Sequence, residues 1–155
     1  MNEDLLAVCS LYADYGFYAD GGKYDEWLGL FTKDCSYQVL PKENADRDLP
    51  ASLIYCASRG MLEDRIESLR LVSKYNLHSD RHIIGVPRVT TIDKDNLLAE
   101  AAFSVYQTEQ EGDTRLFATG LYRDRLQRNG KGFKFNQKMV VLDTFAVPSL
   151  LATPL

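Results

Sequence analysis

The second half of the chain alternates apolar and polar residues in long runs separated by tight turns, and this pattern constrains the fold most. It predicts β-strands at residues 81–92, 97–108, 115–127 and 133–147. The turns between them are at 93–96, 111–113 and 129–130. Because strands joined by turns of about 2–5 residues pair with their neighbours, these segments predict an antiparallel meander.

The first half is mostly helical. In residues 3–20, apolar and aromatic side chains recur every three or four positions, as on one face of an amphipathic helix, and Gly21–Gly22 is suited to end it. Further elements are predicted as helices at 24–31 and 59–75, strands at 35–40 and 51–56, and a solvated charged loop at 42–49. Helices followed by antiparallel strands predict a single α+β domain over residues 1–155. Three helices on one face of a curved sheet would form a cone with a pocket at its mouth.

Composition and charge narrow the classes of function. The 155 residues are 45% apolar and 26% charged, which excludes a disordered or low-complexity chain. Eighteen basic and 22 acidic side chains give a net charge of -4, so we expect no nucleic-acid partner. The first residues are acidic, unlike a signal peptide, and no apolar run reaches the ~18 residues of a membrane span. Three cysteines without a C-x-x-C pair favour a reducing compartment. We therefore expect a soluble cytoplasmic protein with no membrane partner.

The chain has only two histidines, and both lie in one short segment, His78-Ser79-Asp80-Arg81-His82. On a strand, His78, Asp80 and His82 would share one face and offer the ligand types of a non-haem iron site. Alternate strand positions lie ~6.6 Å apart, however, which is a poor geometry for ligands that must converge on one ion. The favoured alternative is an exposed His78 and a packed, hydrogen-bonded His82.

Carboxylates are the remaining candidates for acid-base chemistry, because the chain has neither a G-x-S-x-G elbow nor a phosphate-binding glycine loop. Asp14, Asp20 or Asp143 could act as a base if burial raised its pKa. Asp143 interrupts an apolar run, which points its side chain toward the core. A hydrogen-bonded or edge carboxylate is the more common environment for such a residue.

The aromatic content, nine tyrosines and seven phenylalanines, indicates either a ligand pocket or a packed core with a subunit interface. For any single ring, packing in the core or an interface is the favoured alternative. The residues predicted to line a pocket are Asp14, Tyr15, Tyr55, Tyr106 and Asp143.

Three blocks of sequence occur in series along the chain. The first is Tyr12-Ala13-Asp14-Tyr15 with YDEWLGLFTKDCSY at 24–37, the second is MLEDRIESLR at 61–70, and the third is RHIIG at 81–85 with Pro87-Arg88-Val89. In this order and spacing they resemble the β (small) subunits of aromatic-ring-hydroxylating (Rieske non-haem iron) dioxygenases, over nearly the whole chain. The segments 43–44, 54–58 and 154–155 are similar to the branch that acts on aromatic carboxylates such as terephthalate, anthranilate and salicylate.

The resemblance implies an NTF2-like, SnoaL-like cone, in which a curved, mostly antiparallel mixed sheet wraps three helices. It also implies a hetero-hexamer of three α and three β subunits, with the Rieske [2Fe–2S] cluster and the mononuclear iron on the α subunit. A Rieske centre takes two cysteines and two histidines as C-x-H and C-x-x-H pairs, and this chain has no such pairing. We therefore expect no catalytic residue, cofactor or metal on this chain. Its expected role is a trimeric base that holds the α subunits in register. The predicted structural or subunit-interface residues are Trp27, Tyr37, Arg81, His82 and Arg88.

Two alternatives stay open on the sequence alone. One is a free-standing isomerase, dehydratase or cyclase of the same fold, in which Asp14 or Asp143 acts with His82 and a tyrosine. The other is a homo-oligomeric binding module for an aromatic ligand. An acid-base enzyme should bring its titratable groups together in the pocket, whereas a β subunit need only be packed.

Overall fold

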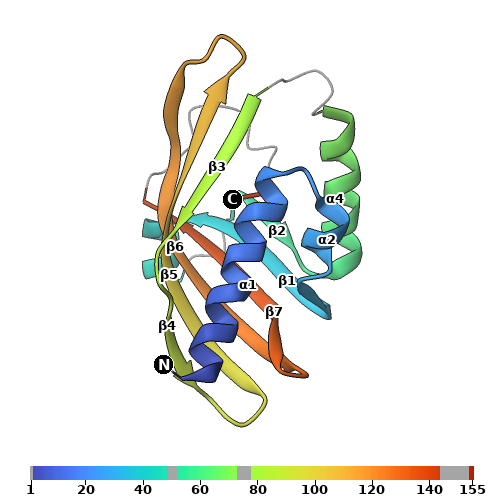
Figure 1. The fold of residues 1–155 in the computed structure, drawn as a ribbon, viewed down its shortest axis with the longest axis vertical. Coiled ribbons are helices and arrows are strands. Elements are labelled where there is room, and N and C mark those ends of the chain that lie inside the picture. Colours follow the sequence, from blue (N-terminus) through green and yellow to red (C-terminus); the bar gives the residue numbers. More distant parts are fainter. Residues whose placement is uncertain (1, 49–51, 73–77, 144–153) are drawn as a thin grey trace.

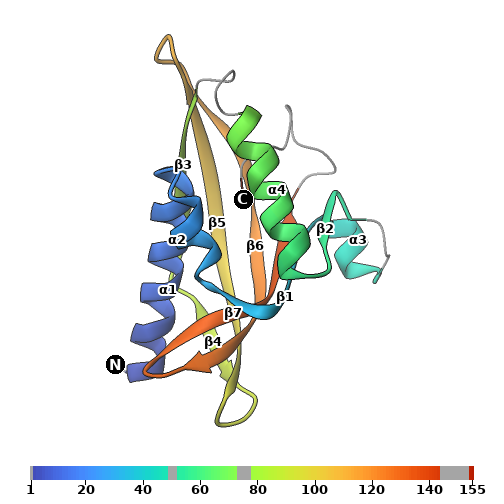
Figure 2. The same cartoon turned by 90° about the vertical axis from the view of Figure 1, so that its right-hand side faces the viewer.

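A computed structural model of the protein describes residues 2–48, 52–72, 78–143 and 154–155. The elements are α1 (Glu3–Asp20), α2 (Tyr24–Leu28), β1 (Phe31–Pro41), α3 (Lys42–Asp46), β2 (Ile54–Cys56), α4 (Arg59–Val72), β3 (His78–Ile84), β4 (Arg88–Thr91), β5 (Asn96–Glu109), β6 (Thr114–Asn129) and β7 (Gly132–Leu142). Helix α1 crosses one face of the sheet and contacts β3 and β7, while α4 lies against β1 and β2 (Figure 1). Seen from the side, the sheet curves between these helices (Figure 2).

The strands form one mixed sheet in the order β2-β1-β7-β6-β5-β3, and β4 also pairs with β5. Every pairing is antiparallel except β1 with β7, which is parallel. Parallel neighbours need a long connection, and here the whole chain between β1 and β7 separates the two strands. The predicted α+β cone, with helices packed on a curved and mostly antiparallel mixed sheet, is confirmed.

Helix α1 follows directly from its sequence. The Asn2 side chain accepts a hydrogen bond from the Asp4 backbone N–H at 3.0 Å, which satisfies one of the free donors at the start of the helix. Its buried residues recur at helical spacing: Val8, Leu11, Tyr12, Tyr15, Gly16 and Ala19. The helix ends at Asp20, and Gly22 then adopts a φ of +68° that other residues rarely take. The predicted stop at Gly21–Gly22 is confirmed.

Several helices and strands begin or end at other residues than the sequence predicts, because tertiary contacts override the local pattern. The predicted helix 24–31 is too long, since α2 ends at Leu28 and the fully buried Phe31 starts β1 opposite Phe135. The predicted loop 42–49 contains the short helix α3, and an ion pair joins Glu43 in this helix to Arg47 directly after it. The predicted strand 81–92 is two strands, because Pro87 has no N–H to give to a ladder. The predicted ends at residues 75 and 147 lie outside the described residues.

Candidate functional site

The interior of the cone contains a buried ion pair. Lys138 Nζ of β7 lies 2.7 Å from Asp124 Oδ2 of β6, and both side chains are 0% exposed. The Tyr12 hydroxyl donates to the same Asp124 oxygen, and the Met139 backbone N–H donates to the other oxygen at 3.1 Å. The carboxylate therefore accepts three hydrogen bonds, which is what a buried charge requires.

Aromatic rings surround the ammonium group of this pair. Lys138 Nζ lies 3.3 Å from the centroid of the Tyr122 ring and 4.3 to 4.8 Å from those of Tyr15, Phe135 and Tyr12. Ring faces attract cations, most strongly where water is excluded. Burial nevertheless lowers the pKa of Lys138 to about 8 and raises the pKa of Asp124. Since neither charge is exposed, the arrangement is suited to fixing the packing of α1 against β6 and β7.

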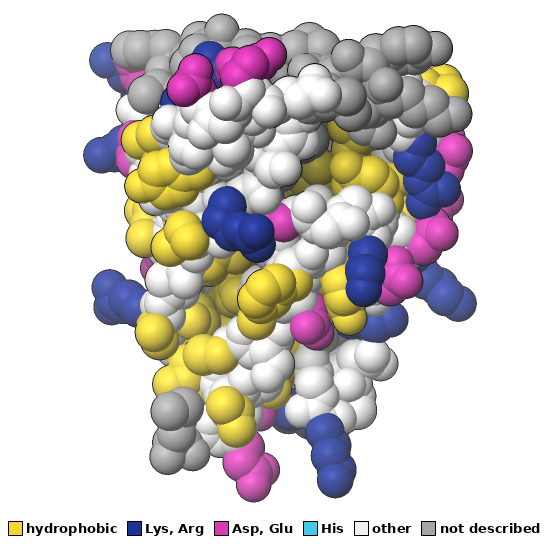
Figure 3. Space-filling view, turned by 45° about the horizontal axis from the view of Figure 1, so that its top comes forward, with side chains coloured by type: hydrophobic (Ala, Val, Ile, Leu, Met, Phe, Trp, Pro, Cys, Tyr) yellow, Lys and Arg dark blue, Asp and Glu magenta, His cyan; other side chains and the backbone are white. Residues whose placement is uncertain are grey.

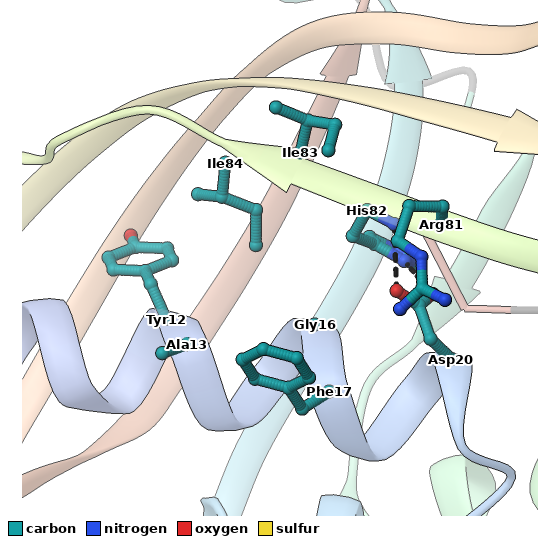
Figure 4. Close-up of a pocket in the computed structure, with 9 residues that line it drawn as sticks. All are labelled: Tyr12, Ala13, Gly16, Phe17, Asp20, Arg81, His82, Ile83 and Ile84. Carbon is teal, nitrogen blue, oxygen red and sulfur yellow. Dashed lines mark hydrogen bonds and ion pairs between the residues drawn. The ribbon is translucent and has the colours of Figure 1, made fainter.

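A second polar pair joins α1 to the edge strand β3. His82 Nδ1 lies 2.6 Å from Asp20 Oδ1, and the His82 backbone N–H donates to Asp20 Oδ2 at 2.8 Å. Figure 4 shows both interactions, with the Arg81 side chain lying beside them. Asp20 thus binds the ring and the backbone of one residue on the sheet edge, which anchors the end of α1 and covers an edge N–H group. His82 Nε2 is buried and has no hydrogen-bond partner among the described residues.

These residues lie in an open groove of about 370 Å³ between α1 and β3. The groove is lined by Tyr12, Ala13, Gly16, Phe17, Asp20, Arg81, His82, Ile83 and Ile84. Large apolar side chains are exposed here, with Phe17 69% and Ile83 56% accessible, and Val86 follows β3 at 80%. Hydrophobic side chains gather in several patches on this face of the molecule (Figure 3). Such exposed apolar area is typical of a surface that contacts another protein.

The structure brings four of the predicted residues together and leaves the others apart. The Tyr15 ring contacts the rings of Trp27 and His82, and Tyr37 contacts Trp27. All four are buried. Arg81 lies at the groove, exposed. The remaining predicted residues are exposed on separate elements or at their ends: Asp14, Tyr55, Arg88, Tyr106 and Asp143.

The carboxylate that meets His82 is Asp20, rather than Asp14 or Asp143, which are both exposed. Asp143 faces solvent directly after the last residue of β7, Leu142, so it does not point toward the core, and its exposure agrees with the favoured alternative of an edge carboxylate. The interface and pocket roles given to the other residues stay predictions.

Sequence reasoning missed Asp124 and Lys138. A signal for Asp124 was present, because it alternates with Tyr122 and Leu126, both of which face the core. The sequence signal for Lys138 is weaker. The pairing of β6 with β7 is irregular between Arg125 and Leu126, and beyond this irregularity the other set of alternate β7 side chains faces the core.

The residues that the structure describes do not fit an iron site or a Rieske cluster. His78 Nε2 lies 3.4 Å from Asp80, whereas His82 turns to Asp20, so the two imidazoles have separate partners. Within the described ranges, no three histidine, cysteine or acidic side chains come together in a way that could hold a metal ion. The three cysteines are free thiols, and burial raises the pKa of Cys35 and Cys56. In the same part of the chain, no helix is long and apolar enough to cross a membrane.

The fold and these contacts define a helix-covered cone of the NTF2-like class without a metal-binding donor set among its described residues. Residues 18–149 match the family described as "Ring hydroxylating beta subunit". The chain belongs to this family of ring-hydroxylating dioxygenase β subunits, as its sequence blocks predicted.

Individual relatives agree with this family. The chain is 34% identical to the small subunit of anthranilate 1,2-dioxygenase from Burkholderia cepacia, over 100% of this chain and 98% of the relative. It is 31% identical to a β subunit of the terminal oxygenase component of terephthalate 1,2-dioxygenase from Comamonas, over 97% of each. A crystal structure assigned to the β subunit of an aromatic-ring-hydroxylating dioxygenase from Novosphingobium aromaticivorans superposes with a TM-score of 0.86 at 40% identity, covering 96% of this chain and 95% of that one.

Proposed function

We propose that this chain is the non-catalytic small subunit of an oxygenase that hydroxylates an aromatic carboxylate. The full-length match to small subunits carries this proposal, and two of those relatives are subunits of dioxygenases of anthranilate and terephthalate, which are both aromatic carboxylates. The Rieske cluster and the mononuclear iron would reside on the large subunit. Among the described residues, no three possible metal ligands come together, which supports that division of labour.

The proposed role is assembly. Each chain would be a single cytoplasmic domain. Three copies would form a trimeric base that holds three large subunits, so that the Rieske cluster of one large subunit lies near the mononuclear iron of the next. Obligate interfaces of this kind bury large apolar areas. The exposed side chains of Phe17, Ile83 and Val86 beside the α1–β3 groove supply such area.

The division of labour is tested by producing the large subunit with and without this chain. We expect iron and acid-labile sulfide to be found only with the large subunit, and turnover of an aromatic carboxylate to require the assembled complex. Turnover by this chain alone, abolished by Asp20→Asn or His82→Gln, would contradict the proposal and favour a free-standing acid-base enzyme.

A further inference from the structure

The segment Pro154–Leu155 lies inside the cone, between α4 and the sheet (Figures 1 and 2). The side chain of Leu155 is fully buried. Its backbone N–H donates to the Tyr37 hydroxyl at 3.3 Å, and its carbonyl oxygen accepts a hydrogen bond from the Tyr15 hydroxyl. The backbone of one residue therefore forms hydrogen bonds with two buried tyrosine hydroxyls, one on α1 and one on β1.

The same part of the interior holds an unused donor. The Trp27 indole N–H is buried without an acceptor among the described residues. Its ring lies 5.5 Å from that of Tyr15 and 5.9 Å from that of Tyr37. Buried indole N–H groups normally find a hydrogen-bond partner. Aromatic walls with a few convergent polar groups are the usual composition of a small-molecule site, and here the polar groups are two hydroxyls and one indole N–H.

We propose that this interior is a binding site for a small apolar ligand that carries one hydrogen-bond acceptor and one donor, and that Leu155 occupies it as an internal ligand. Leu155 provides an apolar branched group, an acceptor for Tyr15 and a donor for Tyr37, which are the features such a ligand would share. A tethered occupant has a high effective concentration and excludes a free competitor. The site belongs to this chain alone, so the inference does not rest on the proposed subunit role.

The test compares the full chain with a variant that lacks Pro154 and Leu155. Both are titrated with N-acetyl-leucinamide while the fluorescence of Trp27, the single tryptophan, is followed. We expect the shortened variant to melt roughly 5–10 °C lower, to bind the amide saturably with a Kd on the order of 1 mM, and to regain thermal stability as it binds. The full chain should show no saturable change at the same concentrations.

Two further variants separate a binding site from ordinary core packing. Leu97→Ala removes another buried leucine side chain, on β5, and its loss of stability should not be restored by the amide. Tyr37→Phe in the shortened chain should weaken amide binding about 2- to 10-fold, because one hydrogen bond is lost. If the shortened chain does not fold, Leu155→Gly takes its place with the same expectations. A folded variant that does not bind the amide, or binds it equally well with Tyr37→Phe, overturns the proposal.

Discussion

Replacing Lys138 with methionine tests whether the buried ion pair holds the core together. The substitution leaves the Asp124 carboxyl fully buried and without its countercharge, with only the hydrogen bonds from Tyr12 and Met139. Removing one partner of a buried pair typically costs about 3–5 kcal/mol. That is a large share of the roughly 5–15 kcal/mol by which a domain is stable.

Urea unfolding followed by Trp27 fluorescence measures this loss. With a urea dependence of about 2 kcal/mol per molar, Lys138→Met should lower the midpoint by roughly 1.5–2.5 M. Asp124→Asn combined with Lys138→Met should regain part of it, because no buried charge remains, the amide oxygen still accepts from Tyr12, and methionine packs well against aromatic rings. A single variant that loses less than about 1 kcal/mol, or a double variant no more stable than the single, would refute the reasoning.

Three further predictions concern the pH dependence of stability, a close backbone contact and the exposed apolar surface. Because the folded pKa of Lys138 is about 8 and its unfolded value is 10.5, the unfolded state holds more protons above pH 8. The Lys138 contribution to the unfolding free energy should therefore rise by about 1 kcal/mol between pH 7 and 9, seen as a difference in slope from Lys138→Met. Gly120→Ala should lower the stability of the folded chain by about 1–3 kcal/mol in thermal melts, because the new Cβ would lie 1.9 Å from the Val141 carbonyl oxygen. Gly112→Ala is the comparison. Gly112 lies in an exposed turn with a φ of +99° and no atom within 4 Å of the new Cβ, so this variant should lose less stability. Ile83→Asp should weaken binding to the large subunit at least tenfold, measured by sedimentation. The melting temperature of the free chain should stay within a few degrees. Gln110→Asp, at the exposed tip of the β5–β6 hairpin, adds the same charge as a control and should leave this binding unchanged.

The order of elements and the antiparallel half of the sheet could be predicted because both depend on local patterns. Alternation and turn residues specify β5, β6 and β7, and helical spacing specifies α1 and α4. The parallel pairing of β1 with β7 could not be predicted in this way, since it joins segments about a hundred residues apart that share no local signal. Phe31 shows the effect, because its pairing with Phe135 takes it out of the predicted helix.

The candidate site was harder to predict than the fold. Asp20 is one of three candidate carboxylates in the sequence, and only the approach of α1 to β3 distinguishes it from Asp14. The pair of Asp124 and Lys138 depends on the register between two strands, including an irregularity that no residue pattern shows. The one local signal of this pair is Asp124 itself, a charged residue at a position of β6 where the neighbouring alternate residues face the core.

The molar mass of the complex formed with the co-expressed large subunit tests the central claim most directly. Light scattering on the eluted complex should give a mass of three large and three small subunits, with both chains in equal amounts. Without this chain, the large subunits should not form a complex of that mass, and they should turn over the aromatic substrate more slowly than the complex does. A large subunit that assembles and hydroxylates its substrate equally well without this chain would contradict the account.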